Sequence, residues 1–381
     1  MSSCTTLLRI NQFWRNIAMK TPQLWTHLYI HTTSVPAVQF YLKHSDRLPL
    51  DVQIELFKHK SLTNTSPLSE ILAENLNRIR SLEIHVSVHK YADKLLAQIG
   101  LGQPAPILES LYIQVRYNSI PVPNSLSLQS AFQSTPRLRH LNLPAYPLPK
   151  PTCPLFSSPD LTDLILDGNP FGTNINENMI FSTIGALKNL QSFTFKSSDN
   201  CTYHETSIFP NINTPHLLSV DVSAGWGVDI LCAFDAPILT FVRFDAMKQD
   251  MSNWTDSYFG PMITLKHLSQ RSPLVKQLEL CGILLFCRER DYLWLFRTAF
   301  PLLEVLKFEG SEVTDEFLAL GANSMLNLKA LELRRCRGVS GPGLFSFLQA
   351  RGKGFQLALY ECDYIANDTL RALSKVVTLK L

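Results

Sequence analysis

The sequence predicts an α/β solenoid, in which short parallel strands and returning helices repeat and each repeat buries its apolar side against its neighbours. One six-residue pattern, with apolar residues at its first, fourth and sixth positions, occurs twice near the C-terminus, at Leu303, Leu306 and Phe308 and at Leu328, Leu331 and Leu333. The offset between the two copies, from Leu303 to Leu328, is 25 residues. This offset lies within the period of leucine-rich repeats.

The same pattern recurs through most of the chain. Further copies begin at Ile79, Leu108, Leu138, Leu161, Leu190, Leu217, Leu239 and Val275, and degenerate copies lie at 50–54, 357–359 and 376–381. A proline stands two residues before seven of the copies, at Pro106, Pro136, Pro159, Pro215, Pro237, Pro273 and Pro301. Proline ends a helix and is tolerated at the first residue of a strand. We therefore expect a horseshoe with its parallel sheet on the concave face, the prolines setting the register.

Composition narrows the class of protein. Apolar residues make up 45% of the chain and charged residues 18%, which is enough for a continuous core. The net charge of +3 is scattered and predicts no nucleic-acid partner. No apolar run is long enough for a bilayer, and the N-terminus lacks a secretory signal, so we expect no membrane association and a cytoplasmic or nuclear location. The eight cysteines form no Cys-x-x-Cys pair.

Catalytic and metal-binding motifs are missing from the sequence. There is no Gly-x-Ser-x-Gly elbow, phosphate-binding loop or His-Glu-x-x-His site, which predicts a non-catalytic protein without cofactor or metal. His85 and His89 are four residues apart, but we expect both on a strand or its exit, where their rings do not converge on a metal. Gly100 is interpreted as a helix stop, and Cys336 and Cys362 as small buried side chains.

The first 31 residues differ from the rest and are expected to form a helical segment, followed by the solenoid over 32–381. Apolar residues at helical spacing predict one amphipathic helix whose stripe contains Leu7, Ile10, Trp14, Ile17 and Ala18. Pro22 disfavours helical geometry at the residue before it, so the helix should end near Thr21. Trp25 follows shortly after and leads into a strand-like segment at 28–30.

The order Trp14-Arg15-x-Ile17-Ala18, followed by Thr21-Pro22-x-Leu24-Trp25, resembles the C-terminal half of an F-box. It is similar to the F-box-like leucine-rich-repeat proteins that are common in mushroom-forming fungi. In that family a Leu-Pro-containing first helix precedes this segment, whereas here the chain begins after it. The resemblance implies a substrate-recognition subunit of an SCF-type cullin-RING ubiquitin ligase, with the small ligase adaptor and the cullin as further partners.

Two roles remain open for the N-terminal residues. One is adaptor binding and the other is a cap on the open end of the repeat core, which a solenoid needs. The residues concerned are Leu7, Ile10, Trp14, Ile17, Pro22 and Trp25.

The fifth position of each repeat pattern should point to the concave face, because side chains alternate along a strand. The candidate partner-binding residues at this position are Tyr112, Asn142, Asp221, Arg243, Glu279, Lys307 and Glu332. Their charges alternate in sign in the C-terminal half, which suits recognition of a protein substrate. The alternative is that these charges pair with one another and bind nothing. The predicted function is a non-catalytic interaction receptor, with a repeat scaffold outside any ubiquitin ligase as the alternative.

Overall fold

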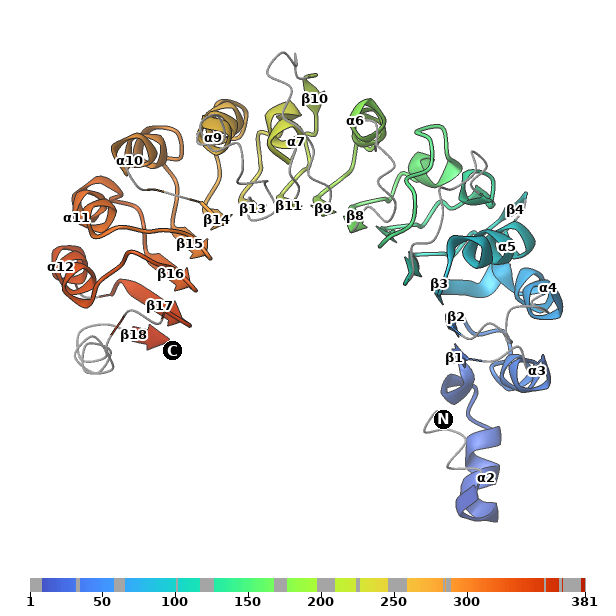
Figure 1. The fold of residues 1–381 in the computed structure, drawn as a ribbon. Coiled ribbons are helices and arrows are strands. Elements are labelled where there is room, and N and C mark those ends of the chain that lie inside the picture. The colour runs from blue at the N-terminus through green and yellow to red at the C-terminus, as the bar shows by residue number, and fades with distance from the viewer. Residues whose placement is uncertain are drawn as a thin grey trace. The chain divides into compact units, whose positions relative to one another are not determined.

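A computed structural model of the protein describes residues 9–31, 35–57, 66–100, 102–116, 127–167, 177–196, 210–223, 227–245, 259–283, 285, 289–352, 354–362, 365 and 378–380. The chain divides into two compact units, Met1–Leu190 and Gln191–Leu381. In each unit, the strands line one side and the helices lie on the other (Figure 1). Within the described residues, each helix is too short or too polar to cross a bilayer.

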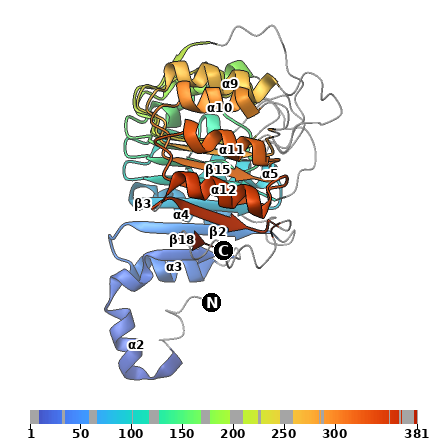
Figure 2. The same ribbon diagram turned by 90° about the vertical axis from the view of Figure 1, so that its left-hand side faces the viewer.

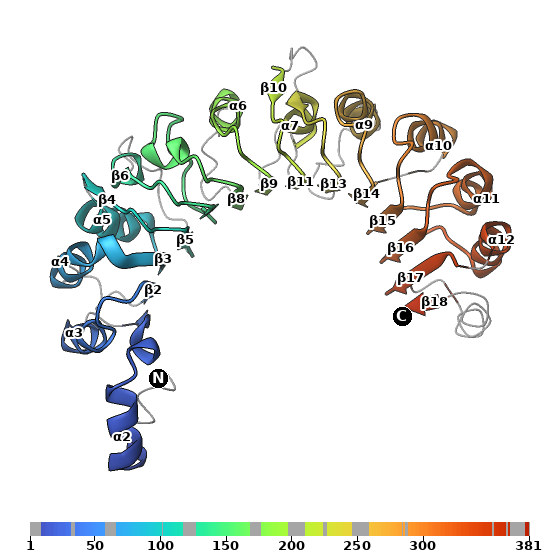
Figure 3. The same ribbon diagram turned by 180° about the vertical axis from the view of Figure 1, so that it is seen from behind.

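The N-terminal unit contains a parallel sheet in the order β1-β2-β3-β5-β7-β8, with α3, α4 and α5 on one side of its first strands (Figure 3). The strands are β1 (His27–Ile30), β2 (Leu50–Leu56), β3 (Ile79–Val86), β5 (Ser110–Val115), β7 (His140–Asn142) and β8 (Asp163–Asp167). The helices are α2 (Gln12–Met19), α3 (Val35–His44), α4 (Ser66–Glu74), α5 (His89–Ile99) and α6 (Glu177–Ala186), with 3-10 turns η1 (Pro22–Trp25), η3 (Leu76–Arg78), η4 (Ser127–Gln129) and η5 (Pro154–Ser157).

The C-terminal unit is built in the same way, with a parallel sheet in the order β9-β11-β13-β14-β15-β16-β17-β18. Its strands are β9 (Ser192–Lys196), β11 (Ser219–Ser223), β13 (Phe241–Asp245), β14 (Gln277–Cys281), β15 (Val305–Glu309), β16 (Ala330–Arg334), β17 (Gln356–Tyr360) and β18 (Thr378–Lys380). Its helices are α7 (Gly227–Ala233), α9 (Phe259–Arg271), α10 (Glu289–Thr298), α11 (Asp315–Ser324) and α12 (Gly341–Arg351), and α9 to α12 stack next to one another (Figure 2).

The α/β leucine-rich-repeat solenoid predicted from the sequence is confirmed. Each predicted copy of the pattern contains a strand, and inward and outward side chains alternate along the strands whose side chains the structure describes. In β15, Leu306 and Phe308 are fully buried, whereas Lys307 between them is only partly buried. Burying one such apolar side chain stabilises the fold by about 1.5 to 3 kcal/mol. The repeated strands therefore form the continuous core expected of a solenoid.

Each of the seven prolines lies four residues before the first residue of its strand, which is earlier than the sequence suggested. Each occupies the second position of a turn before its strand, and not the first residue of the strand itself. In two examples, the turn closes through the amide of Leu138 donating to Thr135 O at 3.1 Å, and that of Leu303 donating to Phe300 O at 3.1 Å. The fixed φ of proline suits this second turn position.

Two turns of the same kind lack the proline and contain asparagine at their third position. The side-chain amide of Asn189 donates to Pro159 O at 2.6 Å, and that of Asn327 donates to Pro301 O at 2.7 Å. Each asparagine thus reaches the proline of the preceding repeat. This side-chain hydrogen bond connects neighbouring turns where no proline fixes the backbone.

Neighbouring helices of the C-terminal unit share their N-terminal caps. Thr314 and Ser340 are the N-cap residues of α11 and α12. The first residue of α10, the buried Glu289, accepts a hydrogen bond from Thr314 Oγ1 at 2.9 Å. Likewise Asp315, the first residue of α11, accepts from the backbone amide of Ser340 at 2.8 Å and from its hydroxyl. An acidic side chain thus holds the cap of the next helix.

Two small parallel pairs were not predicted. β4 (Gln103–Pro104) pairs with β6 (Phe132–Ser134), and β10 (Ile212–Asn213) pairs with β12 (Phe234–Asp235). Strands of two or three residues are too short to show an alternating pattern in the sequence.

The two histidines at 85 and 89 lie on different elements. His85 is in β3 as expected, but His89 is the first residue of α5 and not part of a strand exit. Gly100 ends α5 as predicted, and its amide donates to Leu96 O at 3.0 Å. The described residues contain no group of three His, Cys, Asp or Glu side chains that could hold a metal ion.

Burial of His89 makes stability depend on pH. Burial lowers the pKa of His89, and the nearby Asp93 opposes this shift. As the pH falls through about 6.5, the unfolded chain gains a proton at this position that the folded protein does not yet accept, so stability is lost. We expect the thermal midpoint to fall more between pH 7.5 and pH 5.5 in the wild type than in a His89→Gln variant. Equal falls would contradict this assignment.

Candidate functional site

The N-terminal helix α2 begins at Gln12 and not further upstream. Asn11 has extended backbone angles (φ −161°, ψ 177°), and its side chain accepts a hydrogen bond from the amide of Trp14 at 3.0 Å. Arg9 and Ile10 are also helical, but Asn11 separates them from α2, so the predicted single continuous helix through Ile10 and Trp14 is interrupted at Asn11. Leu7 lies outside the described residues. The helix ends at Met19, close to the predicted end near Thr21.

Three large apolar side chains of α2 face solvent, and we call them the α2 surface: Phe13, Trp14 and Ile17. Their exposed fractions are 66%, 43% and 40%. The rings of Phe13 and Trp14 pack edge to face with centroids 5.8 Å apart. α2 projects away from the strands of its unit (Figure 1). The α2 surface is therefore an exposed apolar group on a helix of the N-terminal unit.

Trp25 occupies a different environment from Trp14. It is fully buried, and its indole nitrogen donates to Ala18 O at 2.8 Å. The rings of Phe40 and Tyr41 on α3 pack edge to face against it, each with a centroid distance of 5.3 Å. Pro22 starts the turn η1 that holds Trp25 in place. Trp25 therefore fills the core between α2 and the first strand, while Trp14 stays accessible.

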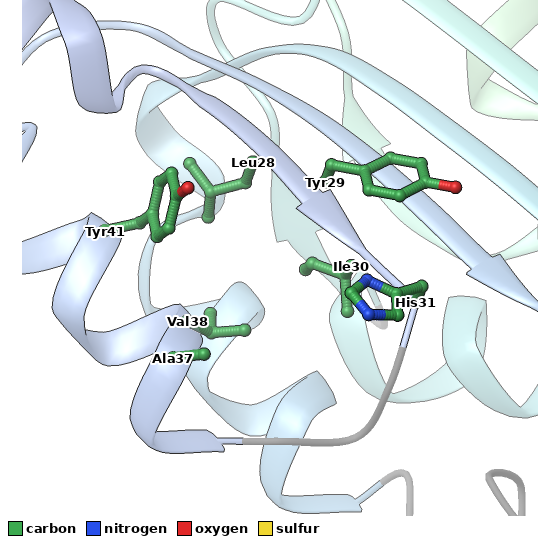
Figure 4. Close-up of a pocket in the computed structure, with 7 residues that line it drawn as sticks. All are labelled: Leu28, Tyr29, Ile30, His31, Ala37, Val38 and Tyr41. Atoms are coloured by element: carbon green, nitrogen blue, oxygen red, sulfur yellow. The ribbon is translucent and has the colours of Figure 1, made fainter. Parts of the chain in front are cut away.

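A pocket lies between β1 and α3, where Leu28 and Ile30 face Val38 and Tyr41 (Figure 4). Its volume is about 60 Å³. Pockets for drug-sized molecules are roughly 300 Å³ or larger. Tyr29 points away from α3, toward the side of the sheet that the helices do not cover (Figure 4). We call this uncovered side the open sheet face.

On the open sheet face of the C-terminal unit, the predicted residues stand directly beside one another. Strand register pairs them in the order Asp221, Arg243, Glu279, Lys307 and Glu332. We call this row the charge ladder. Oppositely charged neighbours across a parallel sheet attract one another. The alternating signs in the sequence therefore become adjacent ion pairs.

Ion-pair distances show that each charge of the ladder has a partner. Arg243 lies 3.6 Å from Asp221, 3.9 Å from Glu279 and 3.6 Å from Glu309. Lys307 lies 2.8 Å from Glu279 and 3.6 Å from Glu332. All these side chains are partly buried, so solvent and salt screen the pairs less than on an open surface. The charges of this row thus pair with one another, which is the arrangement that the sequence offered as the alternative.

Burial also affects the protonation of the ladder. Burial raises the pKa of Asp221, although Arg243 and Lys196 act in the opposite direction. Burial lowers the pKa of Lys307, but hydrogen bonding and charge attraction to Glu279 and Glu332 together outweigh burial, so the pKa is raised overall. The pocket beside the ladder, lined by Arg243, Cys281 and Lys307 among others, has a volume of about 160 Å³. It too is smaller than usual sites for small molecules.

The open sheet face of the N-terminal unit is different in character. Strand register places Tyr29, Gln53, Glu83, Tyr112 and Asn142 in one row, with Glu55, His85 and Gln114 in the next. The predicted residues Tyr112 and Asn142 are thus neighbours. Four residues of these rows were not predicted as partner-binding residues: Tyr29, Glu55, Glu83 and His85. Glu83 is at the fifth position of the copy that begins at Ile79, so the pattern itself identifies it.

The predicted buried role of the cysteines agrees with the structure at Cys336. Its thiol donates to Phe308 O at 3.3 Å, and burial raises its pKa to about 12. A thiol with such a pKa is a poor nucleophile at neutral pH. Cys362 is partly exposed and donates to Leu333 O at 3.5 Å.

No protein-family model matches the sequence, and no curated protein matches it. Among solved structures, the chain is similar to an internalin from Listeria monocytogenes, with 15% identity, 86% of each chain covered and a TM-score of 0.40. It is also similar to a Bacteroides fragilis protein, with 11% identity, 86% of this chain and 73% of the other covered, and a TM-score of 0.35.

Replacement of the two tryptophans should affect stability to very different extents. Replacing the buried Trp25 by alanine should lower the free energy of unfolding by about 3 to 5 kcal/mol, because it leaves a cavity in the core. Replacing the exposed Trp14 by alanine should change it by less than about 0.5 kcal/mol. Urea unfolding followed by circular dichroism measures both, and a similar loss in the two variants would refute the assignment.

The charge ladder predicts that Arg243 is structurally important. An Arg243→Met change leaves three partly buried carboxylates near one another without their shared cation, and we expect a loss of about 1 to 3 kcal/mol in unfolding free energy. Lys329→Met is the matched control, because Lys329 contacts Glu304 at a shorter 2.9 Å but is 69% exposed. We expect no measurable change there, so equal effects in urea unfolding would contradict the role of burial.

Proposed function

We propose that this protein is a non-catalytic receptor that binds a protein partner on its open sheet face. The observation that carries this proposal is the sheet itself. Its outward side chains are partly exposed and stand in register along successive strands, while the two pockets described above are too small for a typical small-molecule ligand. A long polar surface of this kind fits a polypeptide better than a metabolite.

We further propose that the receptor serves an SCF-type cullin-RING ubiquitin ligase, in the cytoplasm or nucleus, with the α2 surface docking on the small ligase adaptor. Two observations support this. The segment from Trp14 to Trp25 resembles the second half of an F-box, and Phe13, Trp14 and Ile17 are exposed on α2 although apolar. The alternative is a repeat scaffold without a ligase role, which needs no partner at α2.

Co-purification tests the ligase role. The tagged full chain should capture the adaptor and cullin, and a Trp14→Ala/Ile17→Ala variant should capture at least about tenfold less adaptor, because aromatic anchors dominate interface energies. Trp294→Ala/Leu326→Ala is the matched control, since both residues are exposed apolar side chains on other elements.

Failure of the wild-type chain to capture the adaptor would favour the scaffold alternative. An equal loss of capture in both double variants would show that the α2 surface is not specific.

A further inference from the structure

The two open sheet faces differ in how their carboxylates are neutralised. In the charge ladder, Asp221, Glu279 and Glu332 each lie within 4.0 Å of a lysine or arginine. On the N-terminal face, Glu55 accepts hydrogen bonds from the Tyr29 hydroxyl and from Gln53 Nε2, the latter at 3.2 Å. Among the described residues, no lysine or arginine pairs with Glu55 or Glu83.

Glu83 also has few hydrogen-bond or ion-pair partners among the described residues. Its carboxylate contacts only His85 Nε2 at 3.5 Å among the described side chains, and 43% of its side chain is exposed. An ionised carboxylate offers about four acceptor positions. Glu55 and Glu83 therefore keep acceptor capacity that faces solvent.

Aromatic rings stand beside these carboxylates. Tyr29 is 45% exposed, and its ring stacks on His31 with centroids 5.7 Å apart. Tyr112 is the strand neighbour of Glu83, and its ring lies 5.0 Å from that of His85. Exposed tyrosine faces attract cations through their electron-rich rings. Carboxylates and rings together favour the same type of ligand, a positively charged one.

Two arginines in this part of the molecule are already engaged. Arg80 forms a paired contact with Asp51 at 3.0 and 2.7 Å, and Arg116 lies over the Phe57 ring at 3.7 Å. Neither arginine forms an ion pair or hydrogen bond with Glu55 or Glu83. We define the acidic-aromatic surface as the surface formed by Tyr29, Glu55, Glu83, His85 and Tyr112.

We propose that the acidic-aromatic surface binds a basic segment of the partner protein, with arginine or lysine side chains placed between the carboxylates and the tyrosine rings. This inference rests on the proposed function, because it assumes that the partner is a protein on the open sheet face. A guanidinium group can donate two hydrogen bonds to one carboxylate and also stack on a ring, which makes arginine the better fit. In the charge ladder, by contrast, each carboxylate is already paired with a lysine or arginine of the same chain.

Fluorescence anisotropy with the full chain tests the proposal. The probe is a labelled peptide of alternating arginine and alanine, measured at physiological ionic strength beside serine-alanine and glutamate-alanine peptides. We expect the arginine peptide to bind most tightly. A Glu55→Gln/Glu83→Gln variant should weaken its affinity by about tenfold or more, and Tyr29→Leu by about threefold.

The control carries the same charge change on the other side of the unit. Glu70→Gln/Glu74→Gln alters two exposed carboxylates of α4 and should leave the affinity unchanged. Circular dichroism verifies that each variant is folded. Equal weakening by both double variants, or absence of arginine-peptide binding, would overturn the inference. Tighter binding of the serine-alanine peptide would also overturn it, while leaving the proposed receptor function intact.

Discussion

The alternation of side chains along parallel strands is the constraint on which the structure depends. Because successive side chains point to opposite sides, residues such as Leu306 and Phe308 enter the core and Lys307 does not. Strand register then aligns equivalent positions from one repeat to the next. A single choice of register therefore determines both the apolar interior and the order of the charges on the open sheet face.

Much of the fold was predictable because the apolar pattern recurs at a spacing that only a repeated unit explains. The N-terminal helix was harder. The spacing of apolar residues does not show that the Asn11 side chain accepts from the Trp14 amide and so caps the start of α2. The separation of Trp14 from Trp25 was also hidden, since it depends on the rings of α3 that enclose only the second tryptophan.

The candidate surfaces were also only partly predictable from the sequence. The fifth-position rule found the charge ladder and Tyr112, but sequence does not reveal which charges neutralise one another. Arg243 reaches three carboxylates, including Glu309 from another row, and only coordinates show this. Conversely, the partners of Glu55 and Glu83 are tyrosine, glutamine and histidine, and not lysine or arginine, among the described residues. Carboxylates of the same type are therefore neutralised by lysine or arginine on one face and not on the other, among the described residues.

The shared caps of α10, α11 and α12 bear on how the repeats respond to damage. Glu289 holds Thr314, and Asp315 holds Ser340, so the start of each helix depends on the one before it. Fraying of an upstream helix removes a hydrogen-bond acceptor from its downstream neighbour, and fraying of the downstream helix removes the donor from the upstream carboxylate. Because such coupling is reciprocal, local opening in these three repeats is shared between neighbouring helices in both directions.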